Sequence, residues 1–320
     1  MGQVAESTPK NGQANLEVFS QTLQNLAEND RNLLVVTSDS RGSGKLVPFG
    51  QKFPKQIVEI GIAEQNLVGV AAGLASAGKK VFAVSPACFL TARALEQIKN
   101  DVAYSDNPVK LIGISAGVSY GALGSTHHSL HDFAVLRAIH NLTVIAPADN
   151  FETQEAIKLA AQTDTPCYIR FGKKNMPDLP QDGKPFEFGK GRIVREGKDL
   201  AIIATGETVW PALQAADILA EESGLQTRVI SMHTLKPLDL DLIRETASNC
   251  KAILTVEEHS IHGGLGEACA SFLLQNGFAK PFKILGIPDE YTVTGSQMEI
   301  FDHYGISPQG IKKLAQSLIS

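Results

Sequence analysis

Residues 57 to 75 read Ile-Val-Glu-Ile-Gly-Ile-Ala-Glu-Gln-Asn-Leu-Val-Gly-Val-Ala-Ala-Gly-Leu-Ala, and this stretch decides the fold class. A short β-branched run ends at Gly61, and a helix built mostly of small residues follows it. A buried strand, a glycine turn and a helix are typical of one unit of a parallel α/β sheet. Glu64 falls in the first turn of that helix, at the mouth of a buried unit.

Glu64 has two interpretations. An exposed acid at a helix N-terminus is stabilised by the helix dipole by less than about 1 kcal/mol, and this is the common role of such a residue. Here Ile60, Ile62 and Leu67 surround it with apolar groups. The helix end favours the ionised carboxyl, whereas burial favours the protonated one. A carboxyl that exchanges a proton needs burial to prevail, so Glu64 is also a candidate catalytic residue.

Composition excludes several classes of protein. The 320 residues are 43% hydrophobic and carry a net charge of −5 with mixed signs, which argues against a nucleic acid partner. The longest weakly polar run, residues 67 to 78, is too short and too rich in glycine and alanine to span a membrane. The N-terminal residues 1 to 13 lack an apolar signal core. Because the four cysteines are dispersed, we expect reduced thiols and a cytoplasmic location.

Strand-like and helical runs alternate along the chain in two blocks. Expected strands are 33–37, 56–60, 80–84, 109–115, 142–146, 167–171, 200–205, 227–232, 252–257 and 282–287. Expected helices are 16–28, 62–77, 89–104, 130–139, 151–162, 209–222, 240–249, 265–275 and 308–319. Asp149 can cap the helix from Phe151, with Glu152 as its capping-box partner. The pattern predicts an α/β fold of two doubly wound domains, the first with a mostly parallel sheet.

The domain boundary is predicted where this alternation breaks down. Between Gly172 and Gly191 the sequence is rich in Lys, Pro, Gly and Asp and has no periodicity. We therefore expect a disordered or extended segment over 1–12, a first domain over 13–175, a linker over 176–190 and a second domain over 191–320.

Several motifs, in order, resemble the thiamine-diphosphate enzymes of the transketolase family. They are Ser38-Asp-Ser-Arg-Gly-Ser43, Gly61-Ile-Ala-Glu-Gln65, Phe89-Leu-Thr-Ala-Arg-Ala-Leu-Glu-Gln-Ile98, Gly124-Ser-Thr-His127, Ala146-Pro-Ala-Asp149 and Tyr168-Ile-Arg-Phe-Gly172. The resemblance covers nearly the whole chain. It implies that the first domain is the pyrimidine-binding domain of that family and the second its C-terminal domain, with a mixed sheet.

The resemblance also implies roles for individual residues. Glu64 would bond N1′ of the cofactor's aminopyrimidine ring and favour its imino form, and Phe89 would stack on that ring. His127 would contact substrate oxygens and act in catalysis. Arg170 would bind a sugar phosphate through its planar guanidinium, although an interdomain salt bridge is nearly as good an interpretation.

Two further residues complete the predicted substrate site. Asp39 and Ser43 follow the first strand, where related enzymes bind phosphate and substrate hydroxyls. Gly42-Ser-Gly-Lys45 is not a Walker loop, because Leu46 stands where Ser or Thr is needed.

The chain is similar to half of an ordinary transketolase. The family's diphosphate and metal site needs a Gly-Asp-Gly segment followed by a distant Asn, and the 320 residues contain no such segment. The resemblance therefore implies a partner subunit that binds the diphosphate and Mg²⁺, in an α2β2 assembly with the active site at the interface. We predict no metal site built by this chain alone.

The remaining histidines are assigned no catalytic role. A zinc site from His127 and His131 would need one shared helical face and a third ligand. We interpret His128 and His131 as loop and helix-surface residues. His259 and His262 lie in a segment that we assign to packing, as neighbours of a site at most.

Departures from the family pattern bear on the substrate. Asn15, Ser115 and Leu123 stand where transketolases usually have Arg, His and Asp, groups that recognise sugar hydroxyls and phosphate. Since a buried polar group without its partner is costly, these changes should alter the choice of substrate. An unusual sugar phosphate such as apulose 4-phosphate would suit a specialised, split transketolase. The alternatives are a β subunit of a 2-oxo-acid dehydrogenase and a non-catalytic, stabilising subunit.

Overall fold

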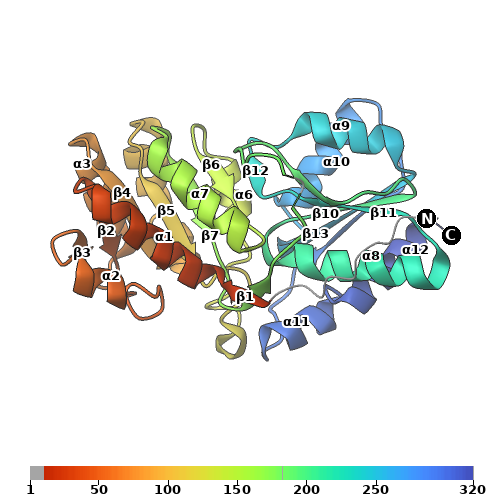
Figure 1. Cartoon of the computed structure of the whole chain (residues 1–320), viewed down its shortest axis with the longest axis horizontal. Helices are drawn as coiled ribbons and strands as arrows, with labels where there is room; N and C mark the ends of the chain where they lie inside the picture. The colour runs from red at the N-terminus through yellow and green to blue at the C-terminus, as the bar shows by residue number, and fades with distance from the viewer. Residues whose placement is uncertain (1–10, 182, 320) are drawn as a thin grey trace.

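The computed structural model describes residues 11–181 and 183–319. Its two α/β units lie next to each other along the long axis of the molecule (Figure 1). A disordered or extended segment was predicted over residues 1–12, and its first ten residues lie outside the described part of the chain. Residues Asn11–Ala14 form a short strand, β1, which pairs antiparallel with β8 (Asn175–Pro177).

The first unit is built on a seven-stranded sheet in the order β12-β6-β7-β5-β4-β2-β3. Six of its strands come from the first 170 residues of the chain and run parallel. They are β2 (Leu33–Thr37), β3 (Ile57–Glu59), β4 (Lys80–Pro86), β5 (Lys110–Ile114), β6 (Thr143–Ile145) and β7 (Cys167–Arg170). The seventh, β12 (Thr234–Lys236), comes from the second half of the chain and pairs antiparallel with β6.

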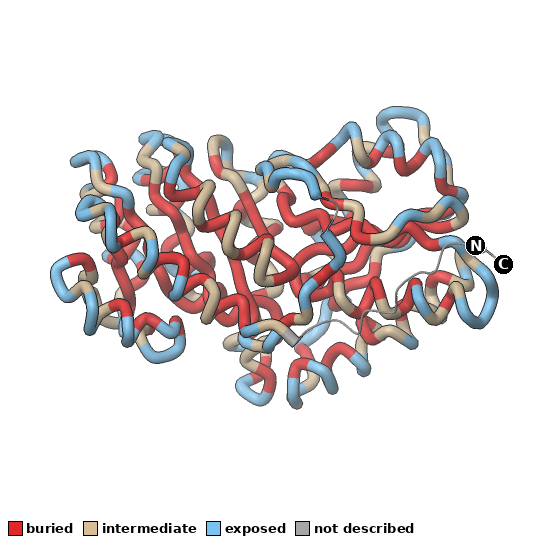
Figure 2. The backbone as a smooth tube through the Cα atoms, viewed as in Figure 1, coloured by how far each residue is buried: buried red, intermediate tan, exposed pale blue. Residues whose placement is uncertain are grey.

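Helices cover both faces of this sheet, as its nearly continuous apolar strands require. Helices α1 (Asn15–Asn29) and α7 (Asn150–Gln162) pack together on one face. On the other face lie α3 (Glu64–Ser76), α4 (Ala87–Arg93) and α6 (Asp132–Arg137). Neighbouring residues of one strand take opposite sides: Val35 joins the α1 side and Val36 the α3 side. The central strands are therefore mostly buried, whereas the edge strand β3 is only partly covered (Figure 2).

The second unit has a five-stranded sheet in the order β14-β13-β10-β11-β9. Its strands are β9 (Arg192–Arg195), β10 (Leu200–Ala204), β11 (Thr227–Ser231), β13 (Ala252–Ser260) and β14 (Phe282–Ile287). All run parallel except β9, which makes the sheet mixed. Helices α8 (Val209–Ser223), α11 (Gln297–Tyr304) and α12 (Pro308–Ile319) pack on one face, and α9 (Leu240–Asn249) and α10 (Leu265–Gln275) on the other. The predicted fold class, two doubly wound α/β units with a mixed second sheet, is confirmed.

Two predicted helices differ from the structure. The helix expected over 89–104 is three pieces: α4, a short α5 (Leu95–Gln97) and a π-helical turn over Ile98–Tyr104. The helix expected over 130–139 begins only at Asp132, because Ser129 pairs with Gly117 in an isolated β-bridge and keeps the chain extended there. The sequence also missed α2 (Val47–Lys52), α11 and the short strands β9 and β12.

The helix cap predicted at Asp149 is present in the structure. Asp149 Oδ1 accepts a hydrogen bond from the Glu152 backbone N–H at 2.8 Å. Glu152 reaches back to the backbone N–H of Ala148 rather than to that of the cap residue. Both carboxylates also bind the Arg192 guanidinium at 2.8 and 2.9 Å, so this helix start is tied to the first strand of the second unit.

Candidate active site

Glu64 lies at the first residue of α3, and its carboxyl is held by an arginine. A turn at Gly61, whose φ of +79° is readily adopted only without a Cβ, separates β3 from the helix. The Glu64 side chain is 3% exposed. Arg93 Nη1 lies 3.2 Å from Glu64 Oε1 and 3.0 Å from Oε2. The buried carboxylate is therefore compensated by one planar cation, whose own side chain is about half exposed.

The same guanidinium covers an aromatic ring. Phe89 and Arg93 stand four residues apart on α4, a spacing that places them on one face of the helix. Arg93 Cζ lies 4.5 Å from the centroid of the Phe89 ring, in a cation–π contact. A flat, hydrogen-bond-donating group is thus held between the ring of Phe89 and the carboxylate of Glu64.

His127 also contacts the ring of Phe89. Its ring meets Phe89 edge to face at 5.2 Å between centroids and Tyr120 in the same way at 5.4 Å. Lys173 Nζ lies 3.8 Å from the centroid of Tyr120. Burial lowers the pKa of the Lys173 ammonium.

We call Glu64, Arg93, Phe89, His127, Tyr120 and Lys173 the contact row. It draws on residues from α3, α4, the loop before α6 and the segment after β7, all near the carboxyl ends of parallel strands. This edge of an open α/β sheet is where such folds bind ligands. An acid, an imidazole, aromatic faces and two cations within one row suit a flat ring with an adjoining anionic substrate.

Three members of the contact row were missed by the sequence analysis. The Arg93 contact follows from its spacing to Phe89 and could have been predicted. Tyr120 and Lys173 are 53 positions apart in the sequence, and no local pattern joins them. Their juxtaposition depends on the strand order of the sheet.

Asp39 and Ser43 lie outside this row. Both are exposed, in the loop after β2, and within the described part of the chain no contact joins either to the contact row. Glu59 links the loop after β2 to the turn that precedes Glu64. Its Oε1 accepts from the backbone N–H of Asp39 at 2.7 Å and of Gly61 at 3.0 Å.

Arg170 forms a buried salt bridge within the first unit, and not the interdomain salt bridge that the sequence left open as its alternative role; only a hydrogen bond to a backbone carbonyl reaches the second unit. Its side chain is 5% exposed, and Nη1 binds both oxygens of Asp132, at 2.9 and 3.1 Å. Nη2 donates to the backbone carbonyl of Glu258 at 2.8 Å, and the guanidinium covers the ring of Phe133. The guanidinium is therefore already engaged at two of its nitrogens and over one face. This geometry favours a structural role over the predicted phosphate contact.

Glu207 and Glu258 form a buried pair of acids near Arg170, which donates to the backbone carbonyl of Glu258. Gln297 Nε2 donates to Glu207 at 3.0 Å and to Glu258 at 2.8 Å, and the Val118 backbone N–H also donates to Glu258. Burial and the neighbouring charge of Glu207 raise the pKa of Glu258 to about 8. Burial raises the pKa of Glu207 as well. The two units are thus joined by carboxyls that favour a bound proton.

The other histidines fall into different environments. His128 lies in a loop, as expected, and is buried against Thr292 of the second unit. His131 contacts Thr91 Oγ1 at 3.2 Å, behind α4. His259 stacks on Phe133, and burial lowers its pKa to about 4. His262 is exposed near Glu267, and like His259 it makes no contact with the contact row among the described residues.

The contact row fits one part of thiamine diphosphate. Phe89 and Glu64 already hold a planar, N–H-donating cation, so the same pair can hold an aminopyrimidine ring, which is also planar and bonds along its edge.

Over residues 11–181 and 183–319, no group of three or more His, Cys, Asp or Glu side chains could hold a metal ion. No helix in this part of the chain is long and apolar enough to cross a membrane.

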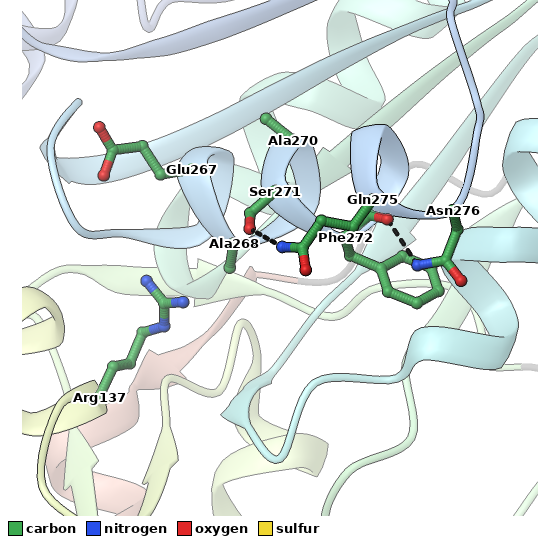
Figure 3. Close-up of a pocket in the computed structure, with 8 residues that line it drawn as sticks. All are labelled: Arg137, Glu267, Ala268, Ala270, Ser271, Phe272, Gln275 and Asn276. Carbon is green, nitrogen blue, oxygen red and sulfur yellow. Dashed lines mark hydrogen bonds between the residues drawn. The ribbon is translucent and has the colours of Figure 1, made fainter.

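A surface hollow lies apart from these residues. It has a volume of about 620 Å³ and lies along α10, with Arg137 of α6 pointing toward it (Figure 3). Arg137 is engaged by the backbone carbonyls of Gly263 and Gly264. None of the predicted site residues lines this hollow, so it is separate from the candidate site.

Two protein families match the chain, one for each unit. Residues 12–178 match the pyrimidine-binding domain of transketolases, and residues 189–311 match the transketolase C-terminal domain. The chain is 47% identical over 302 residues to one subunit of the apulose-4-phosphate transketolase of Phocaeicola vulgatus, and the alignment covers 94% of this chain and 96% of that protein. It is 39% identical over 297 residues to a putative transketolase C-terminal section of Methanocaldococcus jannaschii, covering 92% and 93%.

A solved structure shares the whole architecture. It is a split-gene transketolase, an inactive β4 tetramer, with a TM-score of 0.86 and 35% sequence identity to this chain. The alignment covers 96% of this chain and 99% of that one.

Proposed function

Because the chain belongs to the transketolase family, we propose that it is the pyrimidine-binding subunit of a two-chain, thiamine-diphosphate-dependent transketolase. The complex would transfer a two-carbon ketol unit from a ketose phosphate to an aldose acceptor. The observation that supports this most directly is Glu64, buried at the start of α3 and sharing a planar cation with the ring of Phe89.

The roles of this chain's residues follow from the contact row. Thiamine diphosphate, when bound, supplies the nucleophilic carbon that accepts the ketol unit. Glu64 would hold the edge of the aminopyrimidine and exchange a proton with its ring nitrogen. Phe89 would stack on the ring, and His127 would donate a hydrogen bond to a substrate oxygen. Asp39 and Ser43 would contact the distal substrate hydroxyls or phosphate from the loop after β2.

Lys173 is our choice for the phosphate contact in place of Arg170. Lys173 is an exposed residue whose ammonium lies over Tyr120, the ring that His127 also contacts, whereas the Arg170 guanidinium is enclosed by Asp132 and a backbone carbonyl. A lysine ammonium is a compact positive charge with three hydrogen-bond donors, and both properties suit a phosphate ligand.

The diphosphate and Mg²⁺ are assigned to a partner subunit. The partner would be the N-terminal-half type of transketolase chain, and we propose an α2β2 assembly with the contact row at its interface. The relative from Phocaeicola vulgatus is named as a subunit of its enzyme, which supports a second chain here. We also propose a cytoplasmic location, because all four cysteines are free and buried.

The substrate proposal is a ketose phosphate of unusual structure, with apulose 4-phosphate the first to assay. It rests on the name of the 47% identical relative and on the departures at Asn15, Ser115 and Leu123. These three residues cannot supply the charges that the more usual Arg, His and Asp would offer a pentose phosphate.

The test uses the chain reconstituted with its partner subunit. Glu64→Gln, which removes the exchangeable proton and keeps the shape, should lower ketol transfer at least about a hundredfold. Glu221→Gln, at an exposed position on α8, is the matched control and should change nothing. Full turnover with Glu64→Gln would indicate a subunit that only stabilises its partner. Decarboxylation of 2-oxo acids without ketose-dependent aldose extension would indicate a 2-oxo-acid dehydrogenase β subunit.

A further inference from the structure

The loop that carries His127 is held by the second unit. Thr292, between β14 and α11, donates its backbone N–H to Ser125 Oγ at 2.9 Å. Its hydroxyl lies 2.9 Å from Ser125 Oγ and 2.6 Å from His128 Nδ1. Thr292 and His128 are 8% and 4% exposed, so water does not compete for these bonds. The two residues on either side of the His127–Thr126 pair are therefore fixed by one threonine.

The direction of each of these bonds can be assigned from its partners. His128 Nε2 lies 3.0 Å from the Gly121 carbonyl oxygen, which only accepts, so Nε2 carries the hydrogen. Burial lowers the pKa of His128, and in the neutral ring Nδ1 is then an acceptor. The Thr292 hydroxyl must donate to Nδ1, and the Ser125 hydroxyl to Thr292. The hydrogen bonds therefore run in one direction, from the Ser125 hydroxyl to the Thr292 hydroxyl, from Thr292 to His128 Nδ1, and from His128 Nε2 to the Gly121 carbonyl oxygen.

The backbone of this loop also fits closely against the second unit. Gly121 has a φ of +51°, and a Cβ there would lie 2.5 Å from the backbone carbonyl oxygen of Gly295. A side chain at this position would push the loop away from the 291–296 segment. The loop is therefore shaped for contact with the second unit, while His127 itself points between Phe89 and Tyr120.

We propose that Thr292 is a positioning residue for substrate binding, which sets the place of His127 by fixing Ser125 and His128 on either side of it. The second unit thereby takes part in the site through the loop that it holds, and this inference rests on the proposed role of His127. The Thr292 hydroxyl contacts the histidine loop, and among the described residues it makes no contact with Glu64 or Phe89, which belong to α3 and α4. The loss of this hydroxyl should therefore affect substrate and spare the cofactor.

The experiment compares three variants in the reconstituted complex. Thr292→Val keeps the shape and removes the hydroxyl, and should raise the KM for the ketose phosphate about tenfold, the factor that 1.4 kcal/mol represents. The dissociation constant of thiamine diphosphate, measured by calorimetry, should stay within about twofold. Thr292→Ser restores the hydroxyl and should restore KM. Ser119→Ala is the matched control, because the buried Ser119 hydroxyl on the same loop has no hydrogen-bond partner among the described residues.

A spectroscopic readout separates this proposal from the proposed function. In the ¹⁵N-histidine spectrum of the whole chain, His128 should be the neutral, Nε2-protonated form, and Thr292→Val should shift the His127 resonances. Should Thr292→Val fail to fold, Ser125→Ala takes its place, since Ser125 is half-buried and offers the other half of the same contact. Unchanged KM and unchanged His127 resonances would overturn the proposal. So would an equal loss of cofactor and substrate affinity. A parent complex without ketol transfer would instead overturn the proposed function, while leaving the spectral test of the loop valid.

Discussion

Replacing Arg170 by methionine should destabilise the chain and leave substrate affinity intact. Methionine keeps much of the apolar stem but removes the charge. Asp132, which is 0% exposed, would then be a buried carboxylate without its cation. Removing one partner of a buried ion pair costs about 3–5 kcal/mol. Arg170 holds the pKa of Asp132 below its ordinary value, against the burial that would raise it, and this agrees with a close native pair.

The assay is equilibrium unfolding in urea, followed by circular dichroism. With an m-value of about 3 kcal/mol/M, the upper end for small proteins, a cost of about 3–5 kcal/mol lowers the unfolding midpoint by about 1–1.7 M. Adding Asp132→Asn to Arg170→Met removes the unpaired charge, so the double variant should be more stable than the single one. Arg244→Met is the control. It breaks an exposed pair with Asp241 and should cost less than about 1 kcal/mol.

Two measurements together would refute this reasoning: the stability of Arg170→Met and its KM for phosphorylated substrates. If Arg170→Met is as stable as the parent and raises the KM for phosphorylated substrates alone, then Arg170 reaches the phosphate and our assignment of its role is wrong. Equal KM values for parent and variant, at a reduced midpoint, would confirm that the arginine serves as the buried partner of Asp132 and not as a phosphate contact.

Three more predictions follow from the same structure. Lys173→Ala should raise KM about tenfold for phosphorylated substrates and leave it unchanged for unphosphorylated analogues, whereas the exposed Lys198→Ala should do neither. Arg93→Ala should tighten thiamine diphosphate binding to the complex by calorimetry, because the guanidinium lies where the aminopyrimidine would stack, and tighter binding should come with a lower melting temperature of the free chain. Glu258 has a folded pKa of about 8 against an ordinary 4.5, so it contributes stability that is lost as pH rises through about 8. Glu258→Gln should therefore flatten the fall in melting temperature between pH 5 and 8.5, and an unchanged slope would contradict the shift.

Local features of the fold were predictable from the sequence because their causes are local. The apolar runs around Val35 and Ile112 mark buried strands whatever their neighbours are. Asp149 and Glu152 are three residues apart, so their capping contacts need no knowledge of the rest of the chain. Glu64 could be placed at a helix start beside apolar groups for the same reason.

Features that depend on distant partners could not be predicted. Arg170 is recognisable as an arginine at the end of a strand, but its partner Asp132 lies 38 positions earlier and Glu258 lies 88 positions later. The resemblance therefore favoured a phosphate contact, and an interdomain salt bridge remained as the alternative. His128 was expected only as a loop residue, and its burial was not predicted, because nothing near it in the sequence indicates Thr292, 164 positions away. The π-helical turn over Ile98–Tyr104 likewise has no signal in the apolar pattern.

Strand β12 has a consequence for any attempt to divide this chain. Thr234–Lys236 lie beyond the predicted linker, yet they border Thr143–Ile145 at the margin of the first sheet. A fragment that stops at the linker would therefore present β6 as a bare edge, open to pairing with other molecules. Separately expressed fragments should need each other to stay dispersed in solution, which makes the linker a poor place for a gene to break.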